Sequence, residues 1–250
     1  MGLRATRRRE RDQARDSVAS GRLLLFVDTS GARLNIALSR EGELLATYSA
    51  LHPFSHASAL LPVIDLLLEG QRATVGELAG LGLCIGPGSF TGLRVGMTTA
   101  KAIGAAGHLP TAAVSSTVLL AAGSGASGLV APLIDARRGE VYSSLYRVEG
   151  AGSEPAEVLA PEAGAPLEAI ARILDGAEGN VTLVGSACQT YDAIFRESGG
   201  SRVSWAPPSA CTILPDVLAR VCFGRLKDGI TVDISQLEPL YVGRPPIHGK

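Results

Sequence analysis

Short apolar runs alternate with glycine-rich and polar turns along the chain, a pattern that predicts strands with intervening helices. In the first half, apolar runs of strand length occupy 23–28, 34–39, 43–50, 81–85 and 111–114. Helical segments are predicted over about 55–69 and 90–107. The mixture indicates an α/β fold.

The second half repeats this plan. Its predicted strands are 129–135, 140–148, 158–160 and 181–184, and its predicted helices are 166–174, 188–197 and 210–227. Each half opens with an apolar strand that ends in an aspartate, Asp28 or Asp135. Ligands of such sheets bind beyond the strand ends. We therefore expect a duplicated, two-lobed fold of the actin-like or sugar-kinase-like type, with the two aspartates facing an interlobe cleft.

The predicted division is a disordered Arg-rich tail at 1–20, a first lobe at 21–122 and a second lobe with the C-terminal segment at 123–250. The Gly- and Ser-rich stretch 123–128 is interpreted as the hinge between the lobes.

A helix striped with small residues follows the glycine turn at 86–88. Each interior glycine of a helix costs about 1 kcal/mol relative to alanine, so a ligand or another backbone is expected to approach closely there. The helix over 55–69 is apolar around most of its circumference, which predicts burial on two faces, one of them against a second protein or, alternatively, within the core. The predicted partner interface is Leu60, Val63, Leu67, Gly92, Gly96, Ala100 and Gly104.

Composition limits the function classes. The hydrophobic content is 46%, which excludes a disordered chain, and the longest uninterrupted apolar run, 23–27, is too short to span a membrane. The tail carries six arginines and three acidic residues, a net +3, so the rest of a chain of net charge −1 carries −4. With an aromatic content of only 4%, the body lacks the basic field and stacking surfaces of a nucleic-acid binder. A tRNA-binding module would depend on the tail alone.

Two strand-end turns provide candidate phosphate ligands. Backbone amides, hydroxyls and a carboxylate at such turns suit a phosphate and a metal-bound water, although a strand-ending Asp also caps its own turn. Arg137 and Arg138 stand where a second phosphate loop would ordinarily have glycine and small hydroxyl residues. The weak nucleotide-cleft candidates are Asp28, Thr29, Ser30, Gly86, Gly88, Ser89 and Asp135.

No metal site and no catalytic residue is assigned. His52 and His56 have a metal-compatible spacing, but Pro53 disfavours a helix across both, and a third ligand is missing nearby. His56 is instead expected at a helix start. The four cysteines have neither CxxC nor zinc-type spacing, which is typical of reduced, mostly buried thiols in a cytosolic protein.

Several segments in order resemble the TsaB (YeaZ) family, closely over 23–147 and more loosely beyond. They are Val27-Asp28-Thr29-Ser30, His56 with Leu60-Leu61-Pro62, the run from Gly86 to Gly96, Ala100-Lys101, Val114-Ser115-Ser116, and Ile134-Asp135-Ala136-Arg137 with Gly139-Glu140-Val141-Tyr142.

The resemblance implies an actin-like (ASKHA/ribonuclease H-like) fold and a cytoplasmic, non-catalytic subunit that dimerises with and activates the transferase TsaD. That machinery makes N6-threonylcarbamoyladenosine beside the anticodon of tRNA. The implied partners are a TsaD-like subunit, a TsaE-like ATPase, tRNA through the complex, and a second copy of the chain when it is alone. No intrinsic cofactor is implied, and ATP or ADP belongs to the assembled complex.

TsaD resembles a metalloprotein because an HxxxH pair follows the strand after its glycine helix. The matching stretch here, 114–120, reads Val-Ser-Ser-Thr-Val-Leu-Leu and offers no such pair. The rival hypothesis is a stand-alone actin-fold ATPase or kinase, or a glycoprotease-like metalloenzyme, which needs a working phosphate cleft or metal site.

Overall fold

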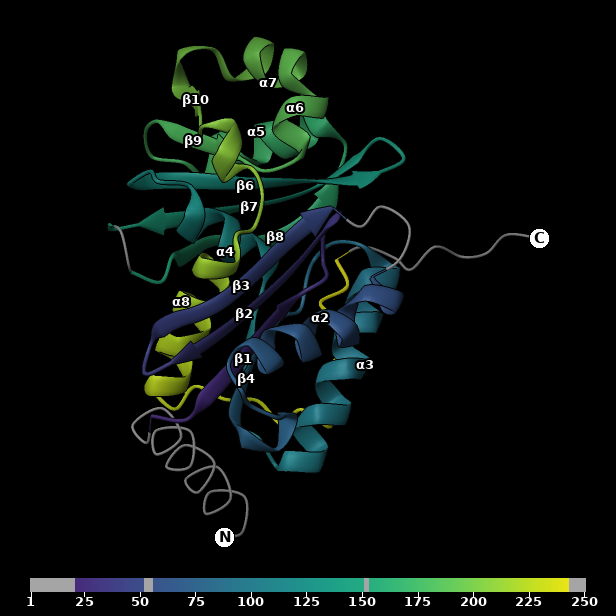
Figure 1. The fold of residues 1–250 in the computed structure, drawn as a ribbon. Helices are drawn as coiled ribbons and strands as arrows, with labels where there is room; N and C mark the ends of the chain where they lie inside the picture. The colour runs from purple at the N-terminus through teal and green to yellow at the C-terminus, as the bar shows by residue number, and fades with distance from the viewer. Residues whose placement is uncertain (1–20, 52–55, 151–152, 243–250) are drawn as a thin grey trace, which may run out of the picture. The chain divides into compact units, whose positions relative to one another are not determined.

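Two five-stranded mixed sheets organise the computed structural model, which describes residues 21–51, 56–150 and 153–242 (Figure 1). Sheet A has the order β3-β2-β1-β4-β5 and is built from β1 (Leu23–Asp28), β2 (Arg33–Arg40), β3 (Glu43–Leu51), β4 (Leu78–Cys84) and β5 (Thr111–Val114). Sheet B has the order β10-β9-β6-β7-β8 and is built from β6 (Gly128–Arg137), β7 (Glu140–Val148), β8 (Ala156–Gly164), β9 (Val181–Val184) and β10 (Val203–Trp205).

The two sheets share one topology. In sheet A, β2 is antiparallel to β1 and β3, while β4 is parallel to β1 and β5. In sheet B, β7 is antiparallel to β6 and β8, while β9 is parallel to β6 and β10. Each sheet thus places its first strand at the centre, and the prediction of a duplicated, actin-like α/β fold is confirmed.

Helices connect and cover these strands. They are α2 (Ala57–Gly70), α3 (Phe90–Gly107), α4 (Ser116–Gly123), α5 (Pro166–Gly176), α6 (Ala187–Thr190), α7 (Asp192–Gly199) and α8 (Pro215–Lys227), with the short 3-10 turns η1 (Val75–Glu77), η2 (Gly200–Arg202) and η3 (Pro208–Ala210). The predicted bounds of β1 and α3 agree with the structure. Helix α4 and strand β10 were not predicted from the sequence, and α6 and α7 were predicted as one helix.

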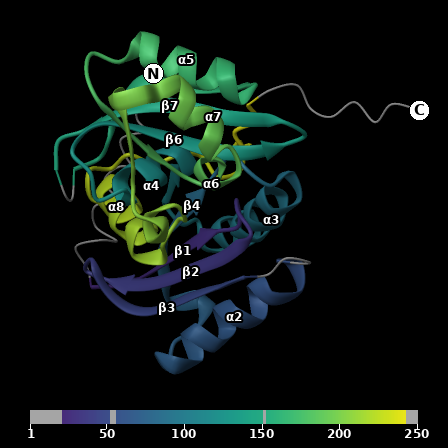
Figure 2. The ribbon, with the colours of Figure 1, turned by 90° about the horizontal axis from the view of Figure 1, so that it is seen from above.

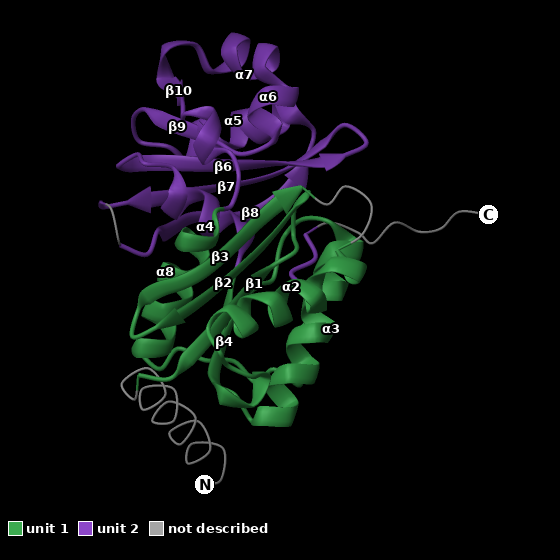
Figure 3. Cartoon of the chain, viewed as in Figure 1, with its two compact units in different colours: residues 1–114, 214–239 green, residues 115–213, 240–250 purple. Residues whose placement is uncertain are grey.

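The chain divides into two units, residues 1–114 with 214–239 and residues 115–213 with 240–250 (Figure 3). The division arises because two helices leave the sheet that precedes them in sequence. Helix α4 follows β5 of sheet A but packs on β6 and β7, whereas α8 follows the strands of sheet B but packs on all five strands of sheet A. The core of each unit therefore includes one helix that comes, in sequence, directly after strands of the other unit.

The predicted boundaries differ from this partition in two ways. The predicted first lobe, 21–122, contains α4, which belongs to unit 2, and the predicted second lobe, 123–250, contains α8 and the segment to Pro239, which belong to unit 1. The stretch 123–128, interpreted as an interlobe hinge, joins α4 to β6 inside unit 2. The tail at 1–20 lies outside the described residues.

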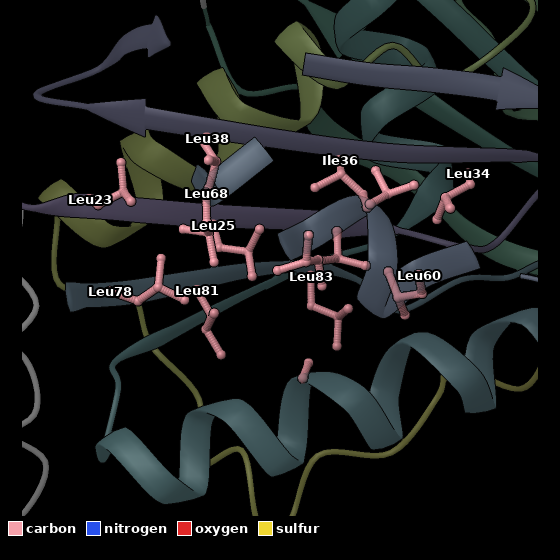
Figure 4. Close-up of a cluster of buried hydrophobic side chains, with 14 of the residues drawn as sticks. Leu23, Leu25, Leu34, Ile36, Leu38, Leu60, Leu68, Leu78, Leu81 and Leu83 are labelled. Carbon is pink, nitrogen blue, oxygen red and sulfur yellow. The ribbon is translucent and has the colours of Figure 1, made fainter. Parts of the chain in front are cut away.

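Strand β1 is apolar from Leu23 to Val27, as expected of a strand whose two faces are both buried. Leu23, Leu25 and Val27 join a core with residues of α2 and α3, including Leu60, Ile64, Leu68 and Met97. Figure 4 labels Leu23, Leu25, Leu60 and Leu68 of this cluster. The alternate residues Leu24 and Phe26 face the other way. A side chain at Gly80 would contact both Leu24 and Leu226, and one at Gly82 both Phe26 and Cys222. Helices α2 and α8 accordingly lie on opposite sides of the sheet (Figure 2).

Unit 2 is built in the same way. Leu129, Ala131 and Leu133 of β6 form a core with Ile170 and Ile173 of α5 and Phe195 of α7. The opposite face of β6 and β7 is covered by α4, where Thr117 Oγ1 and the Tyr146 hydroxyl lie 2.9 Å apart. Both of these side chains are buried, so their hydrogen bond satisfies polar groups that the core would otherwise isolate.

A segment after α8 closes the edge of sheet A. The Val232 amide donates to Thr111 O at 2.9 Å, and Lys101 Nζ of α3 donates to Ser235 O at 3.2 Å. Ile234 is 8% exposed and belongs to the core shared by α2, α3 and β4. This segment is therefore part of the folded body of unit 1.

Ile234→Ala should lower the free energy of unfolding by about 2–4 kcal/mol, because it removes a buried side chain and leaves a cavity. The matched control is Ile230→Ala, since Ile230 is 52% exposed on the same segment and its truncation should cost less than about 0.5 kcal/mol. Urea unfolding of both variants measures the difference. Equal effects would mean that the segment is not packed as described.

Candidate functional site

The candidate site is the turn after β1, formed by Asp28, Thr29 and Ser30. Asp28 Oδ1 accepts a hydrogen bond from the Ser30 amide at 2.8 Å, and Oδ2 accepts one from Asn35 Nδ2 at 2.9 Å. Asn35 Oδ1 in turn accepts from the Ser49 hydroxyl at 2.8 Å. Asp28 is 1% exposed, so its carboxylate is buried with a hydrogen bond to each oxygen.

Asn35 was not among the predicted site residues. Its position follows from strand pairing, because Asp28 and Asn35 are opposite each other in the antiparallel β1–β2 ladder. An antiparallel pair brings opposite side chains on one face to within about 5 Å. Both strands were predicted from the sequence, but the pairing of Asp28 with Asn35 becomes evident only when the register of the hairpin is known.

The glycine turn meets the β1 turn through its backbone. The Ser89 amide donates to Ser30 O at 2.7 Å, and the Ser89 hydroxyl caps α3 by accepting from the Gly92 amide at 3.2 Å. A Cβ at Gly88 would overlap Ser30 O. The peptide bond between Gly86 and Pro87 is cis. The structure thus brings together Asp28, Thr29, Ser30, Gly86, Gly88 and Ser89 in unit 1, as the sequence grouped them.

The small-residue stripe of α3 faces the interior of unit 1. The Thr29 hydroxyl donates to Gly92 O at 2.8 Å. A Cβ at Gly92 would overlap Thr29 O, and one at Gly96 would overlap Thr29 Oγ1. Farther along, a Cβ at Gly104 would lie 2.7 Å from Ile234 Cδ1, and Ala100 is in the core.

The close approach along this stripe is therefore accounted for within unit 1, and the assignment of the stripe to a partner interface stays a prediction. The close approach that the glycines allow is made by the β1 turn and by Ile234 of the same unit. On α2, Leu60 and Val63 are likewise buried in the core, and Leu67 is half-buried against it. The large apolar residues that α2 leaves exposed are Leu61 at 53% and Leu66 at 60%.

His56 and Cys84 complete the surroundings of the turn. His56 immediately precedes α2, as expected of a helix-start residue, and its Nε2 lies 2.9 Å from Gly31 O. Burial raises the pKa of the Cys84 thiol well above its ordinary value, and the nearby Asp28 carboxylate raises it further. Cys84 is consequently a protonated, unreactive thiol. The other histidine of the proposed pair, His52, lies outside the described residues.

The second strand-end aspartate repeats the local geometry in unit 2. Asp135 Oδ1 accepts from the Arg137 amide at 2.8 Å, as Asp28 Oδ1 does from the Ser30 amide, and the Asp135 amide donates to Ser186 Oγ at 3.0 Å. Arg137, Arg138 and Gly139 have φ values of +65°, +55° and +81°. Arg138 and Gly139 therefore form a hairpin turn with both central residues left-handed. That the two aspartates share one cleft stays a prediction.

These turns act chemically as hydrogen-bond acceptors that shape the backbone. Groups of three or more His, Cys, Asp or Glu side chains placed to hold a metal ion are absent among residues 21–51, 56–150 and 153–242. Within that same part of the chain, no helix is long and apolar enough to cross a bilayer.

Residues 52–201 match the family model described as TsaD, tRNA N6-adenosine threonylcarbamoyltransferase. The chain belongs to this family. It is 39% identical over 125 residues to Bacillus subtilis TsaB, a tRNA threonylcarbamoyladenosine biosynthesis protein, in a match covering 50% of this chain and 55% of that protein.

A second relative, Escherichia coli TsaB, carries the same description, is 29% identical over 230 residues, and is matched over 88% of this chain and 94% of its own length. The chain thus spans little more than half of the first relative and nearly all of the second. A solved structure described as an uncharacterized protein with similarity to peptidase YEAZ, from Pseudomonas aeruginosa, superposes with a TM-score of 0.74 at 25% identity. That match covers 89% of this chain and all of the other. These matches confirm the resemblance to the TsaB (YeaZ) family.

The close contact between Gly96 and Thr29 leads to a prediction about stability. Gly96→Ala should lower the free energy of unfolding by about 1–3 kcal/mol, because the new methyl group overlaps the Thr29 hydroxyl and forces the β1 turn away. The matched control is Gly224→Ala, in α8, where a Cβ would have no atom within 4 Å. That change should raise stability by up to about 1 kcal/mol. Urea titration distinguishes the two, and a stabilising Gly96→Ala would contradict the packing of this stripe.

A second prediction concerns the buried carboxylate. Asp28→Ala should lower the free energy of unfolding by about 2–4 kcal/mol, because the buried Ser30 amide and Asn35 side-chain donors lose their acceptors. Asp135→Ala is the control, since the aspartate it replaces makes the same backbone contact at a partly exposed turn. Its cost should be smaller in chemical denaturation. A negligible effect at Asp28 would mean that its hydrogen bonds do not hold the turn.

Proposed function

We propose that the chain is the non-catalytic subunit that dimerises with and activates a TsaD-type transferase in forming N6-threonylcarbamoyladenosine beside the anticodon of tRNA. The observation that carries the proposal is the match to TsaB relatives described as tRNA threonylcarbamoyladenosine biosynthesis proteins, one of them matched over 94% of its length. The match to the TsaD family model supports a shared fold with the catalytic subunit.

The turn after β1 supports a structural role for the residues that a nucleotide-binding relative would use. Asp28, Thr29 and Ser30 are all less than 5% exposed, and they hold β1 against α3 through hydrogen bonds. We accordingly assign ATP or ADP to the assembled complex, with no intrinsic cofactor in this chain. A TsaE-like ATPase and tRNA join through that complex, in the cytoplasm.

The proposed contact with the TsaD-like subunit is the exposed face of α2. Leu61 and Leu66 are the most exposed large apolar residues of that helix, and Asp65 and Glu69 lie beside them. Helix α2 packs against α3, whose first residue, Phe90, is 38% exposed beneath the Arg94 guanidinium at 3.9 Å. Aromatic residues and arginine are among the types enriched in protein interfaces.

Leu66→Asp should weaken binding to the organism's TsaD-like protein at least about tenfold, because a charge replaces an apolar side chain that the interface buries. The matched control is Leu167→Asp on α5 of unit 2, since Leu66 and Leu167 are each 60% exposed. Affinity is measured by titration calorimetry with purified proteins. In the reconstituted pathway, tRNA modification should fall with Leu66→Asp alone.

Circular dichroism and size-exclusion chromatography with light scattering check that both variants remain folded and report self-association. Equal binding by the two variants would place the TsaD contact elsewhere. If the isolated wild-type chain modified tRNA without a TsaD-like subunit, the non-catalytic role would be wrong.

A further inference from the structure

The edges of the two described sheets differ in how they are protected from pairing with a further strand. An open edge strand presents unpaired backbone groups, and proteins protect such edges with short strands, proline, charged side chains, bulges or a covering segment. Both edges of sheet B are protected in this way. Strand β10 has three residues, and β8 contains Glu157, Pro161 and Glu162 and pairs irregularly with β7.

One edge of sheet A is protected as well. Strand β5 has four residues, and the segment that follows α8 lies against it through an antiparallel bridge between Thr111 and Val232. The amide of Val232 donates to the carbonyl oxygen of Thr111 there. A further strand therefore meets a segment of the same chain at this edge.

Strand β3 is the remaining edge, and it lacks these features along most of its length (Figure 2). It has nine residues, none of them proline, and it carries no charged side chain from Leu44 to Leu51. Its pairing with β2 skips Leu45 and is regular over 46–51. Leu44 and Leu51 are 39% and 64% exposed. Strand β3 thus has a long, uncharged edge with an exposed leucine toward each end.

We propose that β3 is a self-association edge, at which two copies of the chain pair antiparallel about a twofold axis and join their A sheets into one continuous sheet. The occupant of the edge is the β3 strand of a second copy. Its outward backbone groups supply the hydrogen-bond partners that the first copy's edge lacks.

The residues of β3 suit pairing with themselves. Leu44 and Leu51 pair with Ser39 and Arg33 of β2. These two β2 positions are six residues apart, so they share a face of the sheet, and so do the two leucines. An antiparallel copy brings the Leu44 end of one strand beside the Leu51 end of the other. Because 44–51 is uncharged, the pairing sets no like charges opposite each other, whereas a charged partner segment would find no complementary charge.

The protection of the other edges limits the assembly to two copies. A twofold pairing uses the same edge of both chains and leaves neither copy of β3 open. The opposite edge of sheet A is covered by the Val232 segment, so the joined sheet has no second open edge at which to grow. Interfaces smaller than about 1,200 Å² are typical of weak complexes. Pairing along one strand therefore predicts a discrete dimer that forms reversibly as concentration rises.

The first experiment compares the full chain with the double variant Thr47→Lys and Leu51→Lys by sedimentation velocity over a range of concentrations. Both side chains are exposed, so the monomer should stay folded, which circular dichroism checks. Lysines on an edge strand oppose pairing, and the dissociation constant should rise at least about tenfold. The matched control is Val158→Lys on β8, since Val158 and Leu44 are each 39% exposed, and it should associate as the wild-type chain does.

Two outcomes would overturn the proposal. One is a wild-type chain that stays monomeric at its highest soluble concentration. The other is a dimer that survives the β3 double variant but is lost in Leu66→Asp, which would assign self-association to the exposed face of α2. Oligomers that grow beyond two copies would contradict the closure at the covered edge.

The second experiment reads the backbone directly by hydrogen exchange and mass spectrometry at low and high concentrations of the full chain. Alternate amides of an edge strand point away from its sheet and are protected only when a further strand pairs with them. Peptides that cover 43–51 should exchange more slowly at high concentration, and peptides that cover 156–164 should exchange equally at both. Unchanged exchange over 43–51 in a chain that dimerises would place the contact elsewhere and overturn the proposal.

Discussion

The hydrogen bond from the Ser89 amide to Ser30 O is the contact on which unit 1 depends. It joins the turn after β1 to the first residue before α3, and it forms only because Gly88, Gly92 and Gly96 leave room for the backbone and side chain of that turn. The glycines cost helix stability, about 1 kcal/mol each. Close packing between the helix and the central strand, together with the Thr29 hydrogen bond to Gly92 O, offsets this cost.

Much of the fold could be predicted because its strands and helices carry strong local patterns. Strand β1 is an apolar run that ends at an aspartate, and α3 follows a glycine turn, so the predicted bounds of both elements agree with the structure. Helix α4 was missed because it is short and buried on nearly every side, so its residues carry no amphipathic period. The positions of α4 and α8 could not be predicted, because the residues of a helix do not indicate which of two sheets it packs against.

The candidate site divides in the same way. Asp28 and Ser89 were found from motif order, whereas Asn35 required a strand register. The glycine stripe correctly indicated a close approach, but small residues cannot say whether the approaching group comes from the same chain or another. The apolar periodicity of α2 had the same ambiguity, which solvent exposure resolves by separating the buried Leu60 from the exposed Leu61.

The placement of α8 has a consequence for the growing chain. When residues 21–114 have emerged from the ribosome, sheet A has all five strands, yet the helix that covers its second face is about a hundred residues away in sequence. Until then Leu24 and Phe26 lack their covering layer. Synthesis adds about 5–20 residues per second, so this apolar face stays open for several seconds. Nascent unit 1 therefore exposes an apolar sheet face during translation, and a chain truncated after β5 would be prone to aggregation.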